Sequence, residues 1–359
     1  MANRRRRLKL VLIVCAIGIG LFILIRSPPE IETPTESFPR EQSPYCSKLC
    51  DQIVAMKSLK GIQNFTKFFL EVKEIMRCPW TSNLTQQMIY KTDLHTHCNS
   101  SMLFITRENT KLGQRLTYEV ERKATKLVDK ILYDMLPETA PWGTSRQFGR
   151  CAVVGNGGIL KNSSCGEKIN TADFVIRLNF PPMNYSSDVG VKSSLVTINP
   201  SQVTGSFMGL CNSRKPFVDK AAAYGNAYLA ISPFSYVIST DLSFRVFYTM
   251  KEMRPQQGVL YIHPDYLLML SRYWRKNGQT GLRLSSGFML VSVALELCEK
   301  VDIYGFWPFP MDLSQQPVSN HYYDNVAAKQ GVHQMSEEFL KLLHMHSQGV
   351  LQLHVGKCQ

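Results

Sequence analysis

The alternation of apolar runs with amphipathic stretches predicts how the second half of the chain is organised. From Cys151 onward, short apolar runs alternate with longer stretches whose apolar residues recur at helical spacing. The runs predict strands over residues 152–154, 174–178, 195–198, 228–231, 259–262, 301–304 and 350–353, and the stretches predict helices over 242–253, 264–274, 286–300 and 336–347. This order favours an α/β fold, with a mostly parallel sheet and helices on both of its faces.

The N-terminal pattern predicts a membrane anchor. Residues 10–25 form an unbroken apolar run, preceded by basic residues at 4–7 and 9 and closed by Arg26. The run is shorter than the ~20 residues that usually cross a bilayer. Its positive flank favours a type II signal anchor over 10–26, with a cytosolic tail over 1–9 and the rest of the chain in the lumen. A cleaved signal peptide is the alternative, but residues 26–30 offer no convincing cleavage site.

Between the anchor and the sheet the pattern is less regular. Proline recurs among polar residues over 27–45, which is typical of an extended stem, and we place the stem at 27–58 and a lumenal domain at 59–359. Helical spacing appears over 59–76, and residues 118–136 have the pattern of a charged amphipathic helix. We expect four cysteines near these segments to pair among themselves, in a connectivity that the sequence leaves open: Cys46, Cys50, Cys78 and Cys98.

Composition agrees with a protein of the secretory pathway. Ten cysteines, nine of them beyond the anchor, suggest disulfides in an oxidising compartment. Sequons for N-glycosylation occur at Asn64, Asn83, Asn99, Asn162 and Asn184. Six of the charges behind the net charge of +13 flank the anchor, so the remainder of the chain is mildly basic, which suits anionic ligands. No arginine-rich run or stacked-aromatic motif follows the anchor, so there is no case for a nucleic-acid partner.

Two segments of the chain are suited to binding an anion. Gly155, Gly157 and Gly158 follow the first predicted strand, and they predict a tight turn in which backbone amides approach a nucleotide phosphate. The GxGG spacing is not the GxGxxG of dinucleotide folds, and alone it is weak evidence. The second segment, residues 285–287, precedes an apolar helix, where its serines either only cap the helix or also face an anion.

Four segments, in order, resemble the motifs of the animal sialyltransferases in the version of the alpha-2,8 branch. Residues 151–160, with Cys165, 173–179 and 188–192, resemble the long sialyl motif, and residues 283–309 resemble the short motif. His321 opens a His-Tyr-Tyr-Asp-Asn stretch similar to the third motif, and His333 with Glu338 is similar to the very short motif, His-x4-Glu. The resemblance covers the core 151–358 nearly end to end. It implies a Rossmann-like, GT-A-like sialyltransferase domain on the lumenal side of the Golgi membrane.

The resemblance also implies a role for each matching residue. His333 would be the base that takes a proton from the attacking sugar hydroxyl, and His321 would stabilise the departing cytidine monophosphate, with Glu338 and Tyr322 in support. The donor-binding residues would be Asn156, Gly157, Asn179, Ser285, Ser286, Gly287 and Trp307. On composition alone, a tryptophan after a strand is more often part of the core than a ligand platform. A generic histidine is likewise more often an ordinary structural residue.

The implied activity is transfer of sialic acid from CMP-sialic acid, with inversion and in alpha-2,8 linkage, onto a terminal sialic acid of a glycolipid or glycoprotein. The chain contains no Asp-x-Asp motif and no Cys/His set with zinc-finger spacing. The single phosphate of CMP-sialic acid needs no paired carboxylates and divalent ion, because hydroxyls, amides and a histidine can neutralise it. We therefore expect no cofactor and no metal. The expected partners are the donor, the sialylated acceptor, the membrane and, as an option, a second copy of the chain.

The resemblance further implies two disulfides. It pairs Cys151 with Cys298 and Cys165 with Cys358, and it leaves Cys211 without an obvious partner. Each bridge would close a loop of more than 100 residues, with a stabilising effect on the order of 5 kcal/mol in the chain-entropy model.

Two departures from the branch pattern motivate a different class of function. Leu178 stands where the branch usually has a cysteine, and Asn320 where it usually has a histidine. The alternative is a weakly active or inactive relative that binds sialylated glycans, and a lumenal assembly protein without a ligand is a third hypothesis. The intact His321, His333 and Glu338 favour the enzyme.

Overall fold

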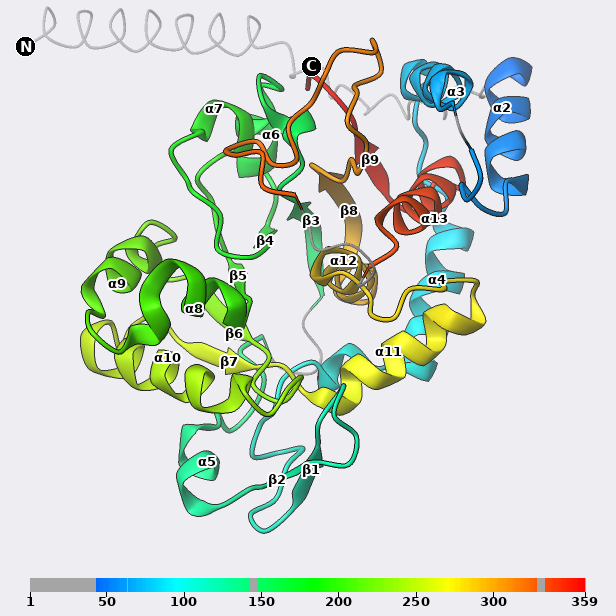
Figure 1. The fold of residues 1–359 in the computed structure, drawn as a ribbon. Coiled ribbons are helices and arrows are strands. Elements are labelled where there is room, and N and C mark those ends of the chain that lie inside the picture. The colour runs from blue at the N-terminus through cyan, green and yellow to red at the C-terminus, as the bar shows by residue number, and fades with distance from the viewer. Residues whose placement is uncertain (1–42, 63, 143–146, 328–332, 359) are drawn as a thin grey trace, which may run out of the picture. The chain divides into compact units, whose positions relative to one another are not determined.

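The computed structural model describes residues 43–62, 64–142, 147–327 and 333–358 (Figure 1). The strands are β1 (Arg115–Thr117), β2 (Thr125–Leu127), β3 (Phe148–Val154), β4 (Phe174–Arg177), β5 (Leu195–Ile198), β6 (Tyr228–Ile231), β7 (Val259–Tyr261), β8 (Cys298–Tyr304) and β9 (Gln352–His354). The helices are α2 (Pro44–Ala55), α3 (Thr66–Arg77), α4 (Leu84–His97), α5 (Lys130–Met135), α6 (Gly166–Asn170), α7 (Ser186–Val189), α8 (Pro200–Phe207), α9 (Lys215–Ala222), α10 (Ser239–Met253), α11 (Pro264–Lys276), α12 (Ser286–Leu297) and α13 (Met335–Ser347), with 3₁₀ turns at Ser100–Met102, Gly158–Leu160 and Met208–Leu210.

The predicted parallel sheet is confirmed. Within the described residues it has seven strands in the order β7-β6-β5-β4-β3-β8-β9, and every neighbouring pair is parallel. The chain starts at β3, moves outward to β7, and then returns to β8 on the other side of β3. Ligands of open α/β sheets bind where the strand order reverses in this way, beyond the carboxyl ends of the strands. The fold therefore directs attention to the loops that follow β3 and β8.

Both faces of the sheet are buried, because successive side chains of a strand point to opposite sides. In β3, Cys151 and Val153 pack in a core with residues of α11, α12 and α13. Ala152 and Val154 pack on the other face, in a cluster with residues of α6 and α7. A third cluster joins β5 and β6 to α8, α9 and α10. Burial on both faces explains why the strands are continuous apolar runs rather than alternating ones.

The N-terminal helices form an outer layer over α11–α13. Helix α2 contacts α13, while α4 contacts α11 and α12, on the right-hand side of Figure 1. Leu49 and Ile53, one helical turn apart in α2, are buried in the main core. The predicted stem, residues 27–58, therefore includes a helix that packs into the domain, because the apolar face of α2 needs a partner.

Two other predictions for the N-terminal half need correction. The helix expected over 59–76 begins only at Thr66. The segment expected to be a helix over 118–136 instead follows β1 and contains β2, which pairs antiparallel with β1, and then the short α5. Tertiary contacts override the helical pattern there. The Glu119 amide donates to the Phe234 carbonyl (2.9 Å), which ties this segment to the loop after β6.

The predicted tail, anchor and first part of the stem, residues 1–42, lie outside the described residues. None of the helices in the part of the chain that the structure describes is both long and apolar enough to cross a membrane.

Candidate active site

The glycine turn, residues 155–158, packs against its own chain. The amides of Gly155 and Gly157 donate to the carbonyls of Tyr304 and Gly305 at 2.7 and 2.9 Å. A Cβ at Gly155 or Gly157 would lie 2.7 or 2.6 Å from the Gly305 carbonyl oxygen, so larger residues do not fit. The prediction that these amides approach a phosphate is therefore wrong for Gly155 and Gly157. Their glycines serve the close approach of the loops after β3 and β8.

The loop that carries His321 lies along this turn. Residues Gly157 and His321 form an antiparallel bridge, and the Tyr322 amide donates to the Asn156 carbonyl at 3.0 Å. The Tyr322 hydroxyl donates to the Pro182 carbonyl at 2.8 Å, and burial raises the pKa of this phenol above its ordinary value. Tyr322 therefore stays protonated and holds the His321 loop against the sheet edge.

Asp324 fixes the ring of His321. The His321 Nδ1 lies 2.6 Å from the Asp324 carboxylate, and the imidazole stacks on Tyr323 at 5.1 Å between ring centroids. Burial alone would raise the pKa of Asp324, but hydrogen bonds from His321 and from the Val326 amide outweigh it and lower that pKa. The carboxylate is thus charged near neutral pH. With Nδ1 engaged, the His321 Nε2 remains available to a ligand.

Two asparagines stand at the carboxyl ends of β3 and β4. The Asn156 Nδ2 donates to the Leu178 carbonyl at 2.8 Å, while its Oδ1 is buried without a hydrogen-bond partner. Asn179 has a positive φ of 59°, and its Oδ1 accepts from the Asn199 amide at 3.3 Å. An unsatisfied buried acceptor is costly unless something occupies it. The Asn156 Oδ1 is therefore suited to a donor group of a bound ligand.

Arg177 places a buried positive charge beneath the same edge. It is fully buried at the end of β4, and its Nη2 donates to the Lys192 carbonyl at 2.7 Å. Its Nη1 has no partner, and burial lowers its pKa to about 10, which still leaves it charged near neutral pH. No carboxylate among the described residues forms a salt bridge with it. Such an uncompensated charge favours an anion nearby.

The start of α12 also lies at the carboxyl edge of the sheet. Ser285 caps the helix, its Oγ accepting from the Phe288 amide at 3.1 Å. The Ser285 amide donates to the Glu338 carboxylate at 2.8 Å, which ties α12 to α13. A Cβ at Gly287 would lie 2.8 Å from Phe306 and 3.0 Å from Leu178. Leu178, which stands where the branch usually has a cysteine, therefore fills the core beneath Gly287.

His333 is oriented by a backbone carbonyl. Its Nδ1 lies 2.9 Å from the Arg283 carbonyl oxygen, just before the Ser285 cap. A carbonyl oxygen only accepts, so Nδ1 carries the proton and Nε2 of the neutral ring carries the lone pair. The side chain is half-buried. His333 is thus held in the tautomer that a general base needs.

Comparison with known proteins decides the family. The sequence profile described as Glycosyltransferase family 29 (sialyltransferase) matches residues 92–350. The chain belongs to this family. It is 42% identical to the human protein called Alpha-2,8-sialyltransferase 8E, over 87% of this chain and 84% of that one. It is 43% identical to an Alpha-N-acetylneuraminide alpha-2,8-sialyltransferase of Xenopus laevis, over 78% of each chain. A solved mammalian sialyltransferase in complex with Gal-beta-1-3GalNAc-ortho-nitrophenol aligns over 87% of this chain and 96% of that one, at 21% identity and a TM-score of 0.43.

The segments that carry most of the residues expected to form the sialyltransferase site meet at this edge, but the Gly157 amide and Trp307 are engaged elsewhere. The segments of Asn156, Asn179, Ser285–Ser286, His321 and His333 converge on the carboxyl edge of the sheet through the contacts described above. Trp307 does not point there. Its side chain is 5% exposed, packs against Phe69, Phe309 and Phe339, and donates to the Met311 carbonyl at 2.7 Å. The prediction of Trp307 as a ligand platform is wrong, because α3 and α13 provide an aromatic core for it.

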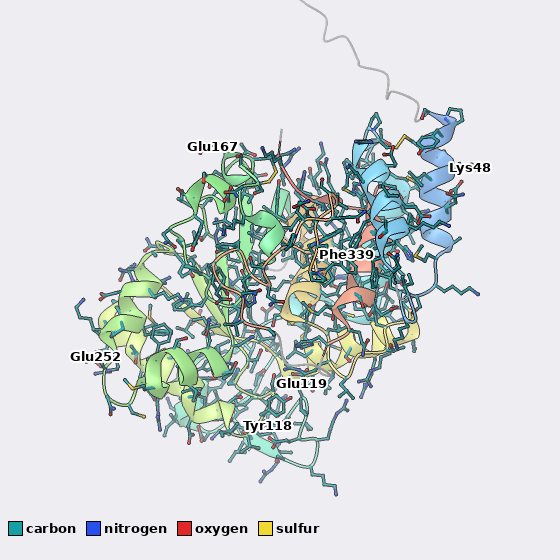
Figure 2. All side chains as sticks on the ribbon, turned by 45° about the horizontal axis from the view of Figure 1, so that its top comes forward. Lys48, Tyr118, Glu119, Glu167, Glu252 and Phe339 are labelled. Carbon is teal, nitrogen blue, oxygen red and sulfur yellow. A yellow bond between two sulfur atoms is a disulfide. The ribbon has the colours of Figure 1, made fainter. Side chains whose placement is uncertain are left out.

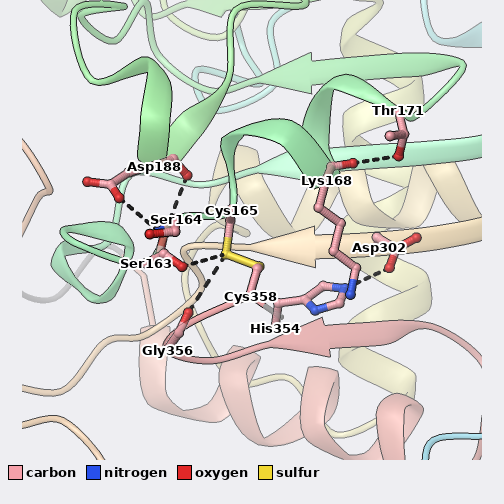
Figure 3. The surroundings of a disulfide bond; sticks show 10 residues. All are labelled: Ser163, Ser164, Cys165, Lys168, Thr171, Asp188, Asp302, His354, Gly356 and Cys358. Carbon is pink, nitrogen blue, oxygen red and sulfur yellow. Dashed lines mark hydrogen bonds and ion pairs between the residues drawn. A yellow bond between two sulfur atoms is a disulfide. The ribbon is translucent and has the colours of Figure 1, made fainter.

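Both disulfides that the family resemblance implies are present, Cys151–Cys298 and Cys165–Cys358. Figure 3 shows the second bridge beside the loop of Ser163 and Ser164, with Asp188 across from it. The Asp188 carboxylate accepts from the amides of Asn162 and Ser164 at 2.8 and 2.9 Å.

The remaining cysteines only partly follow the prediction. Cys46 is paired with Cys78, while Cys50 and Cys98 are buried and unpaired. Cys211 is exposed and also unpaired. The expectation that the four N-terminal cysteines form two bridges is therefore wrong for one pair.

The sequon asparagines lie at accessible places. Asn64, Asn83, Asn162 and Asn184 are exposed, and Asn99 is half-buried. Asn83 is also the cap of α4, its Oδ1 accepting from the Gln86 amide at 3.1 Å. Their use as glycosylation sites remains a prediction.

A cavity beside the glycine turn is distinct from the site. It has a volume of about 530 Å³ and borders the glycine turn at Gly158, with Lys161, Asn162 and Lys357 on its wall. It includes none of the predicted catalytic or donor-binding residues. Within the described residues, no three histidine, cysteine, aspartate or glutamate side chains are placed to hold a metal ion.

Glu338 should make the stability of the domain depend on pH. Burial raises its pKa from 4.5 to about 7. Between these values the folded protein keeps a proton that the unfolded chain has lost, so the free energy of unfolding should fall by about 3 kcal/mol as the pH rises through this window. Glu338→Gln cannot ionise, and its amide oxygen can still accept from Ser285. We expect the variant to lack this decrease in the free energy of unfolding, as measured by urea denaturation at about pH 5 and about pH 8. The same pH dependence in both proteins would contradict the assignment.

Sequence reasoning missed several residues of the site. Asp324 stands three residues after His321, and that spacing within a short loop was the available signal. Arg177 lies within the segment 173–179 that resembles the long motif, and its burial becomes visible only in the fold. Nothing local in the sequence points to the Arg283 carbonyl as the partner of His333, because the two residues are 50 positions apart.

Proposed function

We propose that this protein transfers sialic acid from CMP-sialic acid, in alpha-2,8 linkage and with inversion, onto the terminal sialic acid of a sialylated glycolipid or glycoprotein. The family supplies the donor, and the printed names of the relatives supply the linkage. The observation that carries the proposal is His333 at the carboxyl edge of the sheet, in the tautomer whose Nε2 is free to accept a proton. A Golgi location, a type II anchor over residues 10–26 and a homodimer belong to the same proposal.

The reaction follows from the arrangement of the residues. His333 Nε2 takes the proton of the acceptor's 8-hydroxyl while that oxygen forms a bond to C2 of the donor sugar. The bond from C2 to the phosphate oxygen breaks, and its electron pair leaves with cytidine monophosphate. His321, in its protonated form beside Asp324, donates Nε2–H to the leaving phosphate. Ser286 and the field of Arg177 complete the anion site, while Asn156 Oδ1 accepts from a donor group of the nucleoside. Charge on the single phosphate is met by these groups, so we expect the reaction to proceed without a metal.

The proposal is tested by a transfer assay on the secreted chain without its first 30 residues, made in a glycosylating host. The enzyme is incubated with CMP-sialic acid and EDTA, against sialylated glycolipids and glycoproteins in parallel. We expect a disialyl product in the presence of EDTA, and the better acceptor identifies the substrate class. Absence of transfer to every acceptor, despite measurable binding of CMP or of a sialoglycan, would instead support a relative that binds sialylated glycans.

A further inference from the structure

We infer that Glu119 is a positioning residue for His333 and acts through Arg283. The inference rests on the proposed role of His333 as the base. Arg283 contributes two separate groups, since its carbonyl oxygen accepts from His333 Nδ1 while its guanidinium points to Glu119. Whatever fixes the side chain of Arg283 therefore also restrains the carbonyl that orients the base.

Glu119 and Arg283 form a bidentate ion pair. Arg283 Nε donates to Glu119 Oε1 and Nη2 to Oε2, both at 2.7 Å. The Ser235 hydroxyl donates to the same carboxylate at 2.6 Å and accepts from Arg283 Nη2 at 3.0 Å. The guanidinium also lies over the Tyr236 ring, 5.8 Å from its centroid. Paired donors of this kind fix orientation as well as distance.

Burial makes the pair a rigid anchor rather than a surface contact. The Glu119 side chain is 8% exposed and that of Arg283 is 29% exposed. The backbone of Glu119 is itself held, because its amide donates to the Phe234 carbonyl and the Val120 amide donates to the Ser235 carbonyl. Three segments that are distant in sequence thus meet beneath His333. Removing the charge of Arg283 leaves the Glu119 carboxylate buried and uncompensated.

The backbone around Arg283 needs such an anchor. Residues 277–284 connect α11 to α12 without regular structure, and Leu282 beside Arg283 is 74% exposed. On the other side, the Ser285 amide is held by Glu338. Arg283 is thus fixed by its own side chain on one flank and by Ser285 on the other. A shift of about 1 Å in a reacting group can cost about 100-fold in rate.

We expect Glu119→Gln to lower kcat by about 10- to 100-fold. The KM for CMP-sialic acid should stay within about twofold of the wild-type value, because Ser285 at the start of α12 is held separately by Glu338. Arg283→Lys keeps the positive charge but loses the two parallel N–H donors of the guanidinium. It should likewise lower kcat while leaving the KM for CMP-sialic acid nearly unchanged. In the double variant the two losses should not multiply, since each single change already breaks the same pair.

The matched control is the exposed ion pair of Arg214 and Glu252, whose Nη1–Oε2 distance is 2.6 Å. Figure 2 labels Glu119 and Glu252 at separate places on the molecule. Glu252→Gln should leave kcat unchanged, because an exposed pair contributes little. All rates are taken well below the melting temperature of each variant, so that lost stability does not appear as lost activity.

Each outcome separates this inference from the proposed function. If His333→Ala abolishes transfer while both Glu119→Gln and Arg283→Lys keep kcat within about twofold, Glu119 is only structural and the inference is overturned. A lower melting temperature with unchanged kcat has the same meaning. If His333→Ala itself remains active, the proposed base is wrong, whatever the Glu119 variants do. Should Glu119→Gln fail to fold, Arg283→Lys tests the inference alone. A kcat that is about 10- to 100-fold lower supports the inference, and an unchanged kcat overturns it.

Discussion

Replacing His333 with alanine should lower kcat for sialyl transfer by about 10²- to 10⁴-fold, the usual contribution of a general base. The reason is the hydrogen bond from Nδ1 to the Arg283 carbonyl, which leaves Nε2 as the group that accepts a proton at the sheet edge. The donor contacts involve other loops, so the affinity for CMP should change little. Initial rates over a range of acceptor concentrations give kcat, and calorimetric titration with CMP gives the affinity.

His97→Ala is the control for this experiment. His97 is exposed on α4, where its ring hydrogen-bonds to the Asp93 carbonyl at 2.8 Å. Its removal should leave both kcat and CMP affinity at their wild-type values. If His333→Ala transfers sialic acid at a rate within about threefold of wild type while it still binds CMP, another group serves as the base.

Removal of the disulfide between Cys151 and Cys298 should have the largest effect on stability. The two cysteines join the middle of β3 to the start of β8, the neighbouring strands where the strand order reverses, and both side chains are buried. The bridge spans 147 residues, so its loss should lower the free energy of unfolding by about 5 kcal/mol in the chain-entropy model. For a domain of ordinary stability, this is a large part of the total. Urea denaturation of Cys151→Ser/Cys298→Ser gives the change, and a failure of the variant to be secreted would agree with it.

Cys211→Ser is the matched control, because Cys211 is exposed and unpaired. Its stability should remain within about 0.5 kcal/mol of wild type. A double variant of Cys151 and Cys298 that unfolds at the wild-type urea concentration would show that the packing of β3 against β8 holds the strands without the bridge.

The parallel sheet could be predicted because its strands are buried on both faces. Continuous apolar runs such as Leu195–Ile198 and Tyr228–Ile231 are hard to place anywhere but in a central strand, and both have the predicted bounds. Local pattern failed where a distant segment decides the backbone. Residues 118–136 have helical spacing, yet Glu119 and Val120 donate their amides to the loop after β6. The apolar face of α2 also has its partner, α13, about 280 residues further along the chain.

In the candidate site, too, residue types could be predicted from local sequence, whereas features that depend on distant segments could not. Its histidines and the Ser285 cap could be named from the sequence because their residue types and order resemble family motifs. Their orientation could not, since it depends on backbone carbonyls and on side chains from other elements, such as the Arg283 carbonyl and Glu338. The prediction that Trp307 and the glycine turn face the ligand fails for the same reason. The sequence shows a tryptophan and three glycines, and only the fold shows that they pack against the aromatic core and against Gly305.

The most direct test is a crystal structure of the lumenal domain with bound CMP. The proposed site predicts that the phosphate lies between the start of α12 and His321, within hydrogen-bond distance of His321 Nε2, with Asn156 Oδ1 accepting from the nucleoside. CMP bound instead in the cavity of Lys161 and Lys357, with the sheet edge empty, would contradict it.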